Sequence, residues 1–482
     1  MDTYIGIDLG TSGVKALLVD IDGNILSENS VSYPCFHPQE GYSEQNSEDW
    51  YEKTLLCLDG LLKDQKKECV RALAISGQMH GLVILDKDDR VIRPAILWND
   101  SRSEKECSYL NDVIGKKRIC EDTGNIAFPG FMAPKILWVY EHEKENFDRI
   151  DKIMLPKDYL IYKFSGSFAS DVSDASGMLL LDVEKRTYSS DMLDLCHIKE
   201  SMLPHLFESY EEVGTLSMMI AERLGLSASV KIIAGAGDNA GAAIGTGCVK
   251  EGDCNISLGT SGTIFMPMDH FVADKENALH SFCDSSGKYH LMGCILTASS
   301  ARSFWLENIL NSNDYDKDES ELADSDVIFL PYLCGERSPH NDVDIRGAFI
   351  GLSINTTRGQ MSKAIMEGVA FALKDCLNVA LKDGIKVTSA SICGGGARSS
   401  SWRQIVSDVL GIPLKTMVTN QGPSYGSAIL AMVGDGKYAS VEEACSILCK
   451  VKDVILPDDK KREYYDRKYA RFVRLYPALK GI

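Results

Sequence analysis

The chain has 482 residues, 44% hydrophobic and 25% charged, which is typical of a globular protein. This length favours two domains of roughly 240 residues each. The net charge of −18 argues against nucleic acid or an anionic membrane as a partner, but backbone dipoles can still bind phosphate. No apolar run is long enough to span a membrane, there is no signal-peptide pattern, and the fifteen cysteines contain no Cys-x-x-Cys pair. We expect a cytoplasmic protein with reduced thiols.

The chain opens with three predicted strands, residues 4–9, 14–19 and 25–33. The loop Gly10-Thr11-Ser12-Gly13 joins the first two. A glycine-flanked hydroxyl turn exposes N–H groups and hydroxyls that can bind phosphate oxygens, although a simple hairpin is the alternative. Asp8 precedes this loop, either as a turn former or as a carboxylate that holds Mg²⁺ through water.

A buried strand is predicted at residues 72–75, after a helix that begins near Ser47. The strand runs into the polar sequence Gly77-Gln78-Met79-His80-Gly81. Loops at the carboxyl ends of strands are where α/β proteins bind ligands. His80 is therefore a candidate to hydrogen-bond a polyol, and a structural histidine is the alternative.

A further strand, residues 232–234, leads through a glycine-rich turn into a helix of small residues. Asp238 follows Gly-Ala-Gly at the start of this helix. It is either an N-cap, a role that aspartate fills well, or a base directed at a substrate hydroxyl. The residues alone place Asp238 slightly ahead of the other acids as the base.

The first loop recurs letter for letter as Leu258-Gly259-Thr260-Ser261-Gly262. The repeat predicts a duplicated domain, with a division into residues 1–247 and 248–482. The two copies differ at one position, because Ser257 stands where the first copy has Asp8. Only the first half therefore offers a carboxylate for a metal ion at this place.

The second half is expected to repeat the plan, with strands at residues 327–330 and 390–393 and a helix over 360–381. The last strand ends in Gly394-Gly395-Gly396-Ala397-Arg398, which permits close approach of a ligand and is neither a Walker loop nor a full Rossmann fingerprint. Each loop alone could be a tight turn. Together they predict a two-domain phosphotransferase, but they do not identify the substrate.

These segments resemble the FGGY carbohydrate kinases, and within that family the xylulokinases. The matching segments span nearly the whole chain. They are the first strand and loop, Gly77-Gln78-Met79-His80-Gly81, residues 94–100, Leu155-Pro156-Lys157-Asp158-Tyr159-Leu160, Gly237-Asp238-Asn239, Gly335-Glu336-Arg337-Ser338-Pro339-His340-Asn341, residues 394–399, and two signatures near residues 132–142 and 347–367. Met132 stands where the family usually has Ser, Thr or Pro.

The resemblance implies an α/β fold of two ribonuclease-H-like (actin-like ATPase) domains with a central cleft. It implies ATP-dependent phosphorylation of D-xylulose to D-xylulose 5-phosphate, with ATP and Mg²⁺. Asp238 would be the base and Asp8 the metal-side carboxylate. The sugar contacts would be Met79, His80, Asp238 and Asn239, the phosphate loops residues 10–13 and 259–262, and the nucleoside loop residues 394–398.

Two alternatives stay open at this stage. One is a kinase for another ketose or polyol, such as ribulose, fuculose or a tetritol. The other is an actin- or Hsp70-like nucleotide switch, because fold does not fix function. The chain has no appended peptide-binding region, and Gly237-Asp238-Asn239 suits a sugar kinase better than a switch. The oligomeric state is also open, with a homodimer as one alternative.

Overall fold

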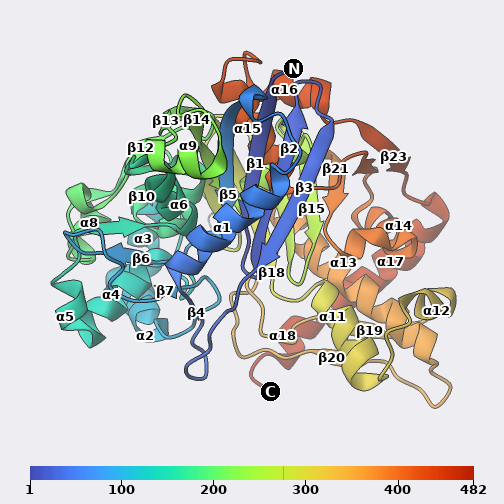
Figure 1. The fold of residues 1–482 in the computed structure, drawn as a ribbon. Coiled ribbons are helices and arrows are strands. Elements are labelled where there is room, and N and C mark those ends of the chain that lie inside the picture. The colour runs from blue at the N-terminus through green and yellow to red at the C-terminus, as the bar shows by residue number, and fades with distance from the viewer. Residues whose placement is uncertain (275) are drawn as a thin grey trace.

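The computed structural model describes residues 1–274 and 276–482 and contains two central sheets (Figure 1). The first sheet has six strands. In spatial order they are β13 (Glu212–Thr215), β14 (Lys231–Gly237), β5 (Val70–Gly77), β1 (Thr3–Leu9), β2 (Gly13–Asp20) and β3 (Ile25–Ser32). Burial alternates along the edge strand β3, whereas the central strands β1 and β5 are almost fully buried. The three strands predicted at the start of the chain are therefore confirmed.

The second sheet repeats this plan. Its seven strands, in spatial order, are β17 (His280–Cys283), β18 (Tyr289–Ile295), β16 (Gly262–Met268), β15 (Gly252–Leu258), β21 (Val387–Cys393), β22 (Leu414–Met417) and β23 (Val451–Ile455). The pairs β1–β2 and β15–β16 are antiparallel, and the pairs β1–β5 and β15–β21 are parallel. The order β14-β5-β1-β2-β3 thus matches β22-β21-β15-β16-β18, as expected for two ribonuclease-H-like domains.

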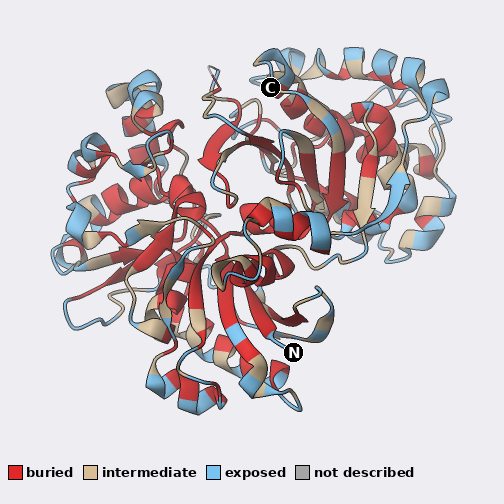
Figure 2. Ribbon diagram, turned by 90° about the horizontal axis from the view of Figure 1, so that it is seen from above, coloured by how far each residue is buried: buried red, intermediate tan, exposed pale blue. Residues whose placement is uncertain are grey.

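Helices cover both sheets, and their inner faces are buried (Figure 2). The helix α1 (Ser47–Leu61) packs on β2 and β3, as predicted from its start near Ser47. In the second half, α13 (Arg358–Lys382) begins at an N-cap and capping box formed by Thr357 and Gln360. This helix matches the one predicted over residues 360–381.

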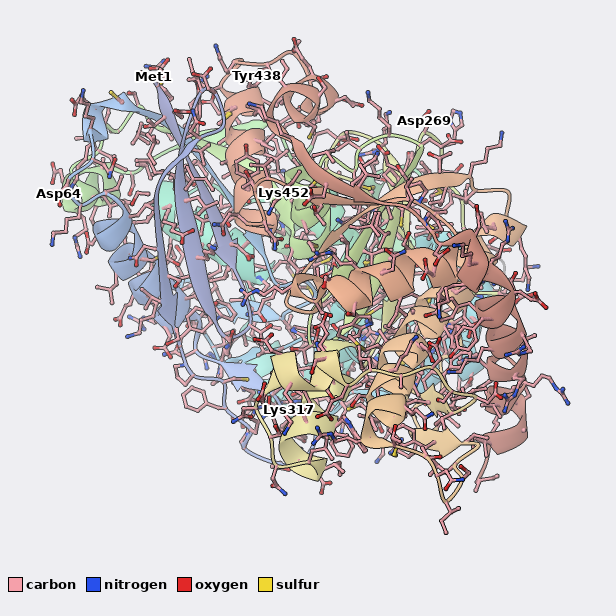
Figure 3. The ribbon with its side chains drawn as sticks, turned by 90° about the vertical axis from the view of Figure 1, so that its right-hand side faces the viewer. Met1, Asp64, Asp269, Lys317, Tyr438 and Lys452 are labelled. Atoms are coloured by element: carbon pink, nitrogen blue, oxygen red, sulfur yellow. The ribbon has the colours of Figure 1, made fainter. Side chains whose placement is uncertain are left out.

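One helix from late in the chain packs on the first sheet. The helix α15 (Pro423–Gly434) contacts β1, β5 and α10 (Asp238–Gly245). The approach requires glycine in β1, because a Cβ at Gly6 would lie 1.9 Å from the Ser424 carbonyl oxygen. Near this helix, Tyr438, labelled in Figure 3, donates its hydroxyl to the Ile21 carbonyl at 2.9 Å. The division at residue 247 stays a prediction. The two sheets separate near this residue, but α15, from the second half of the chain, packs on the first sheet.

Between β5 and β14 the chain forms the outer part of the first half. Its main helices are α4 (Met132–His142), α6 (Pro156–Ser165) and α7 (Val172–Ala175). Phe282 and Met292, from the β17–β18 hairpin, pack into the same apolar cluster. The two halves therefore share an apolar cluster here, in addition to the packing of α15 on the first sheet.

The strand predicted at residues 327–330 forms as β19 (Ile328–Leu330). It pairs with β20 (Ala348–Ile350) in a separate two-stranded sheet, because its apolar residues pack against α13 and not beside β21. All fifteen cysteines are free thiols. In the part of the chain that the structure describes, no helix has both the length and the apolar character needed to cross a membrane.

Candidate active site

The site begins at the carboxyl edge of the first sheet, where three neighbouring strands end. Asp8 in β1 is paired with Ser76 in β5, and Gly77 is paired with Gly237 at the end of β14. Adjacent strands lie about 4.8 Å apart, so Asp8 and Asp238 lie two strands apart, roughly 10 Å, at one edge. Gly237, not Asp238, is the N-cap of α10. Asp238 is therefore not the N-cap residue of this helix.

Asp238 lies close enough to Asp8 to affect its pKa. Burial raises the pKa of Asp238 to about 6, against the effect of hydrogen bonds from the backbone and side chain of Asn239. Burial, followed by the negative charge of Asp238, raises the pKa of Asp8 to about 7, whereas Lys15 lowers it. At neutral pH Asp238 is therefore mostly ionised and can accept a proton.

The first glycine loop is held by contacts from several elements. Gly10 donates its N–H to the Gly13 carbonyl at 3.0 Å. The Trp98 indole N–H donates to the Thr11 hydroxyl at 2.9 Å, and Gln45 Nε2 donates to the Thr11 carbonyl at 2.7 Å. Ser12, at the tip of the loop, is exposed. A loop fixed in this way can present its N–H groups to a ligand without reorganising.

The second loop is held by the start of α11 (Ser299–Ser303). Ser299 donates its N–H to the Gly259 carbonyl and its hydroxyl to the Leu258 carbonyl, each at 2.9 Å. Ser300 donates its hydroxyl to the Thr260 carbonyl at 2.7 Å. Ser261 and Gly262 complete the turn into β16.

The third loop lies directly against the second. Gly394 has a φ of +89°, and a Cβ there would lie 2.7 Å from the Leu258 carbonyl carbon. Only glycine permits this contact between two backbones. Gly396, Ala397 and Arg398 then form a short 3-10 turn before α14 (Ser400–Leu410).

A cavity of about 350 Å³ lies between Asp238 and the third loop. Asp238 and Asn239 line it from the first half, and Ser257, Gly394, Gly395 and Arg398 line it from the second. A second cavity, of about 360 Å³, shares Gly395 and Arg398 and extends to Tyr315 and Trp402. Asp238 and the third loop therefore face the same cavity. The adjoining cavity has aromatic side chains that suit the ring of a nucleobase.

His80 has a defined protonation state. Burial lowers its pKa to about 3, so the ring is neutral, and Nδ1 lies 2.7 Å from the Gly177 carbonyl oxygen. Because a carbonyl can only accept, Nδ1 carries the proton and Nε2 is left as an acceptor. The ring also stacks on Phe131 at 4.6 Å. Nε2 can therefore accept a hydrogen bond from a hydroxyl group.

The segment that contains His80 lies against the end of β14. A Cβ at Gly237 would lie 2.9 Å from the Met79 sulfur, so Met79 packs directly beside the residue that precedes Asp238. His80 has a φ of +69°, and buried Lys135 donates to its carbonyl at 2.9 Å. Asn239 accepts a hydrogen bond from the Thr263 hydroxyl of the second half at 3.3 Å. The four predicted sugar contacts thus lie on adjoining segments.

Comparison with known proteins identifies the family. The N-terminal domain model of the FGGY family of carbohydrate kinases matches residues 3–245, and the C-terminal domain model matches residues 254–434. The chain belongs to the FGGY family of carbohydrate kinases. It is therefore an ATP-dependent sugar kinase, as the resemblance implied, and not a nucleotide switch.

Individual relatives match this chain over nearly its full length. The chain is 40% identical to a xylulose kinase of Escherichia coli (strain K12) over 483 residues, which is 99% of each chain. It is 37% identical to the crystal structure of a xyloylose kinase from Brucella ovis, with a TM-score of 0.93 and 99% of each chain covered. A gluconate kinase from Lactobacillus acidophilus shares the fold at 24% identity, with a TM-score of 0.95 and coverage of 100% of this chain and 98% of that one.

Asp8 is a residue of this kinase that could hold a divalent cation. Its Oδ1 atom is buried and has no hydrogen-bond partner among residues 1–274 and 276–482. Carboxylate oxygens are preferred ligands of Mg²⁺, and a cation would relieve the repulsion between Asp8 and Asp238. The residues present therefore fit the Mg²⁺ that the resemblance implied.

Several residues of the site were not identified from the sequence. Trp98 positions the first loop through its hydrogen bond to Thr11. Arg337, from the second half, places its guanidinium 5.4 Å from the centre of the Phe128 ring in the first half. Ser173 accepts a hydrogen bond from the residue before Asp238. No local pattern marks these roles, because each depends on contacts between segments far apart in sequence.

Proposed function

We propose that this kinase transfers the γ-phosphoryl group of ATP to the primary hydroxyl of D-xylulose, giving D-xylulose 5-phosphate and ADP. The reaction type is supported chiefly by one observation, the cavity that Asp238 shares with the third glycine loop. The sugar is supported by full-length identity to relatives named xylulose kinase.

In the proposed mechanism the sugar hydroxyl oxygen attacks the γ-phosphorus, and the bond to the β–γ bridging oxygen breaks, so that ADP leaves. Asp238 orients the hydroxyl and accepts its proton, late in a loose transition state. Neutral His80 accepts a hydrogen bond at Nε2 from another hydroxyl, and Asn239 binds a third polar group beside the base. The glycine loops donate N–H groups to phosphate oxygens.

We also propose that Asp8 holds Mg²⁺ through water. When bound, the ion neutralises charge on the transferring phosphoryl group. Asp8 is suited to this role because its buried oxygen has no protein partner among the described residues. The second loop, with Ser257 at the same place, offers no carboxylate there. We further propose a cytoplasmic location, based on the cysteine content.

The experiment that tests this function is ADP release, measured with a coupled enzyme in the presence of ATP and Mg²⁺. D-xylulose, D-ribulose, L-fuculose, a tetritol and gluconate are compared with a reaction that contains no sugar. Fastest release with D-xylulose supports the proposal. Faster release with another sugar would assign that sugar instead, and release no greater than the sugar-free rate with every sugar would refute the kinase activity.

A further inference from the structure

A buried cluster of charged side chains lies behind the catalytic edge of the first sheet. Lys157, near the start of α6 (Pro156–Ser165), places its Nζ 2.6 Å from Asp158 Oδ1, 2.9 Å from Asp171 Oδ1 and 3.9 Å from Asp174 Oδ2. All four side chains are at most 1% exposed. The lysine belongs to a motif that carried the family resemblance and has no role in the proposed mechanism.

Lys157 keeps its positive charge despite its burial. Burial by itself lowers the pKa of Lys157, but the surrounding carboxylates, Asp158 first, raise it above its ordinary value. Burial raises the pKa of Asp158 and, more strongly, that of Asp174. Buried ion pairs can often be replaced by apolar residues without loss of stability. Stability alone is therefore a weak reason for this cluster to lie here.

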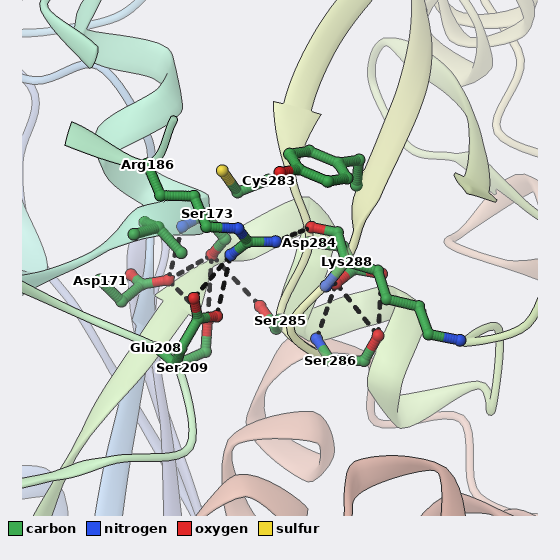
Figure 4. Close-up of polar contacts among 12 residues, drawn as sticks. Asp171, Ser173, Arg186, Glu208, Ser209, Cys283, Asp284, Ser285, Ser286 and Lys288 are labelled. Atoms are coloured by element: carbon green, nitrogen blue, oxygen red, sulfur yellow. Dashed lines mark hydrogen bonds and ion pairs between the residues drawn. The ribbon is translucent and has the colours of Figure 1, made fainter. Parts of the chain in front are cut away.

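A continuous chain of hydrogen bonds leads from the cluster to the residue before the base. Asp171 Oδ2 accepts from the N–H of Ser173 at 2.9 Å, from the Ser173 hydroxyl at 2.5 Å and from the Ser209 hydroxyl at 2.6 Å (Figure 4). The single hydroxyl proton of Ser173 thus goes to Asp171, and its oxygen is left as an acceptor. That oxygen accepts the N–H of Gly237 at 3.1 Å.

Two further contacts fix the same place. A Cβ at Gly77, the strand partner of Gly237, would lie 3.0 Å from Lys157 Cβ, so the lysine stem packs against the end of β5. Ser285, from the second half, donates its hydroxyl to the Ser173 oxygen at 3.2 Å (Figure 4). Ser173 is therefore the point where the cluster, the base segment and the other half meet.

We propose that Lys157, Asp171 and Ser173 are positioning residues for Asp238. Lys157 fixes Asp171, and Asp171 sets the direction of the Ser173 hydroxyl. Ser173 then holds the Gly237 amide, which determines where the next residue directs its carboxylate. This inference rests on the proposed function, in which Asp238 is the base.

The test compares two serines that both donate to Asp171, of which only Ser173 holds the Gly237 amide. Ser173 and Ser209 are both fully buried, and both donate to Asp171 Oδ2. Only Ser173 also accepts the Gly237 N–H. We expect Ser173→Ala to lower kcat by roughly 10- to 100-fold with little change in KM for ATP, because a small displacement of a catalytic group has effects of this size. Ser209→Ala should stay within about threefold of wild type, since it leaves the Gly237 contact in place.

A double-mutant cycle separates positioning from a general structural effect. In the Asp238→Asn background the base is already lost, so Ser173→Ala should lower kcat by less than about twofold further, because residues that act as a unit are not additive. The same fold loss in both backgrounds would overturn the inference, and so would wild-type kcat for Ser173→Ala. If Ser173→Ala does not fold, Asp171→Asn replaces it in the same cycle.

The outcomes also separate this inference from the proposed function. Absence of sugar-dependent ADP release in the wild-type protein refutes the function, and full activity of Asp238→Asn refutes the role of the base. An active wild type, an impaired Asp238→Asn and an additive cycle refute the positioning role alone.

Discussion

Replacing Asp238 by asparagine tests the base with little change in shape. The amide oxygen of the new side chain can still accept from Asn239 Nδ2, which donates to Asp238 Oδ1 at 2.9 Å. The negative charge and the proton acceptor are lost. General-base catalysis contributes about 10²–10⁴-fold, or roughly 3–5 kcal/mol of activation free energy. We therefore expect kcat to fall by that factor or more, with KM for ATP little changed.

The same substitution should stabilise the protein at neutral pH. The carboxyl of Asp238 has an ordinary pKa of 3.8 and a pKa of about 6 in the folded protein. Below pH 3.8 the carboxyl is protonated in both the folded and the unfolded state, so it does not reduce the stability of the protein. As pH rises from 3.8 to 6, the unfolded state releases its proton first, and the folded state loses up to about 3 kcal/mol of stability. Asp238→Asn removes this loss, so its Tm should exceed that of wild type at pH 7.5, by a margin that shrinks toward pH 5.

The assay is sugar-dependent ADP release, combined with thermal unfolding at the two pH values. Asp375→Asn is a matched control, because burial also raises the pKa of Asp375 to about 6 and the residue, in the second half, lines neither of the two cavities of the site. It should shift Tm in the same direction and leave kcat unchanged. If Asp238→Asn keeps more than about half of the wild-type kcat, Asp238 is not the base. A lower Tm at pH 7.5 would show that its carboxylate is not destabilised by burial.

Three further outcomes are expected. The kcat of the wild type should fall about tenfold per pH unit below pH 6, because Asp238 acts in its ionised form and its pKa is about 6; a flat profile down to pH 5 would contradict this. Asp8→Ala should lower kcat and raise the Mg²⁺ concentration needed for half-maximal activity, whereas the matched change Ser257→Ala should have a much smaller effect. Equal losses of kcat in the two variants would show that the difference between Asp8 and Ser257 has no role. His80→Ala should weaken discrimination between D-xylulose and analogues that lack the contacted hydroxyl, which we expect to be roughly 5–200-fold in kcat/KM for wild type. An unchanged preference would make His80 a structural residue.

The duplication could be predicted because it depends on local sequence. The five letters of residues 9–13 recur at 258–262, and each copy joins two apolar strands. Strands and helices with clear patterns, such as α13, were predicted within a few residues of their observed bounds. The position of α15 could not be predicted in this way. Its small and apolar residues fit either sheet equally well by pattern, and only close packing against Gly6 shows that it covers the first.

The candidate site also contains features that could be predicted from the sequence and features that could not. Asp238 and the glycine loops could be found because each follows a strand, and the carboxyl ends of strands meet at one edge. The protonation state of His80 could not be predicted, because it depends on its contact with Gly177, 97 residues later. The same holds for Ser173 and Gly237, which lie 64 residues apart in the chain. Contacts of this kind have no periodic pattern.

The difference between the two copies of the first loop accounts for how a symmetric fold can support an asymmetric reaction. Both copies provide a fixed turn with N–H groups for phosphate oxygens. At the sheet edge the first half adds two carboxylates, Asp8 and Asp238. Burial makes the ionised form of each carboxylate less favourable, so both pKa values are raised. A cation at Asp8 would remove part of that cost and lower the pKa of Asp238, which would leave a greater fraction of the base ionised. We therefore expect the acid limb of the pH profile to move to lower pH as the Mg²⁺ concentration rises, and a limb that does not move would show that the two carboxylates act independently.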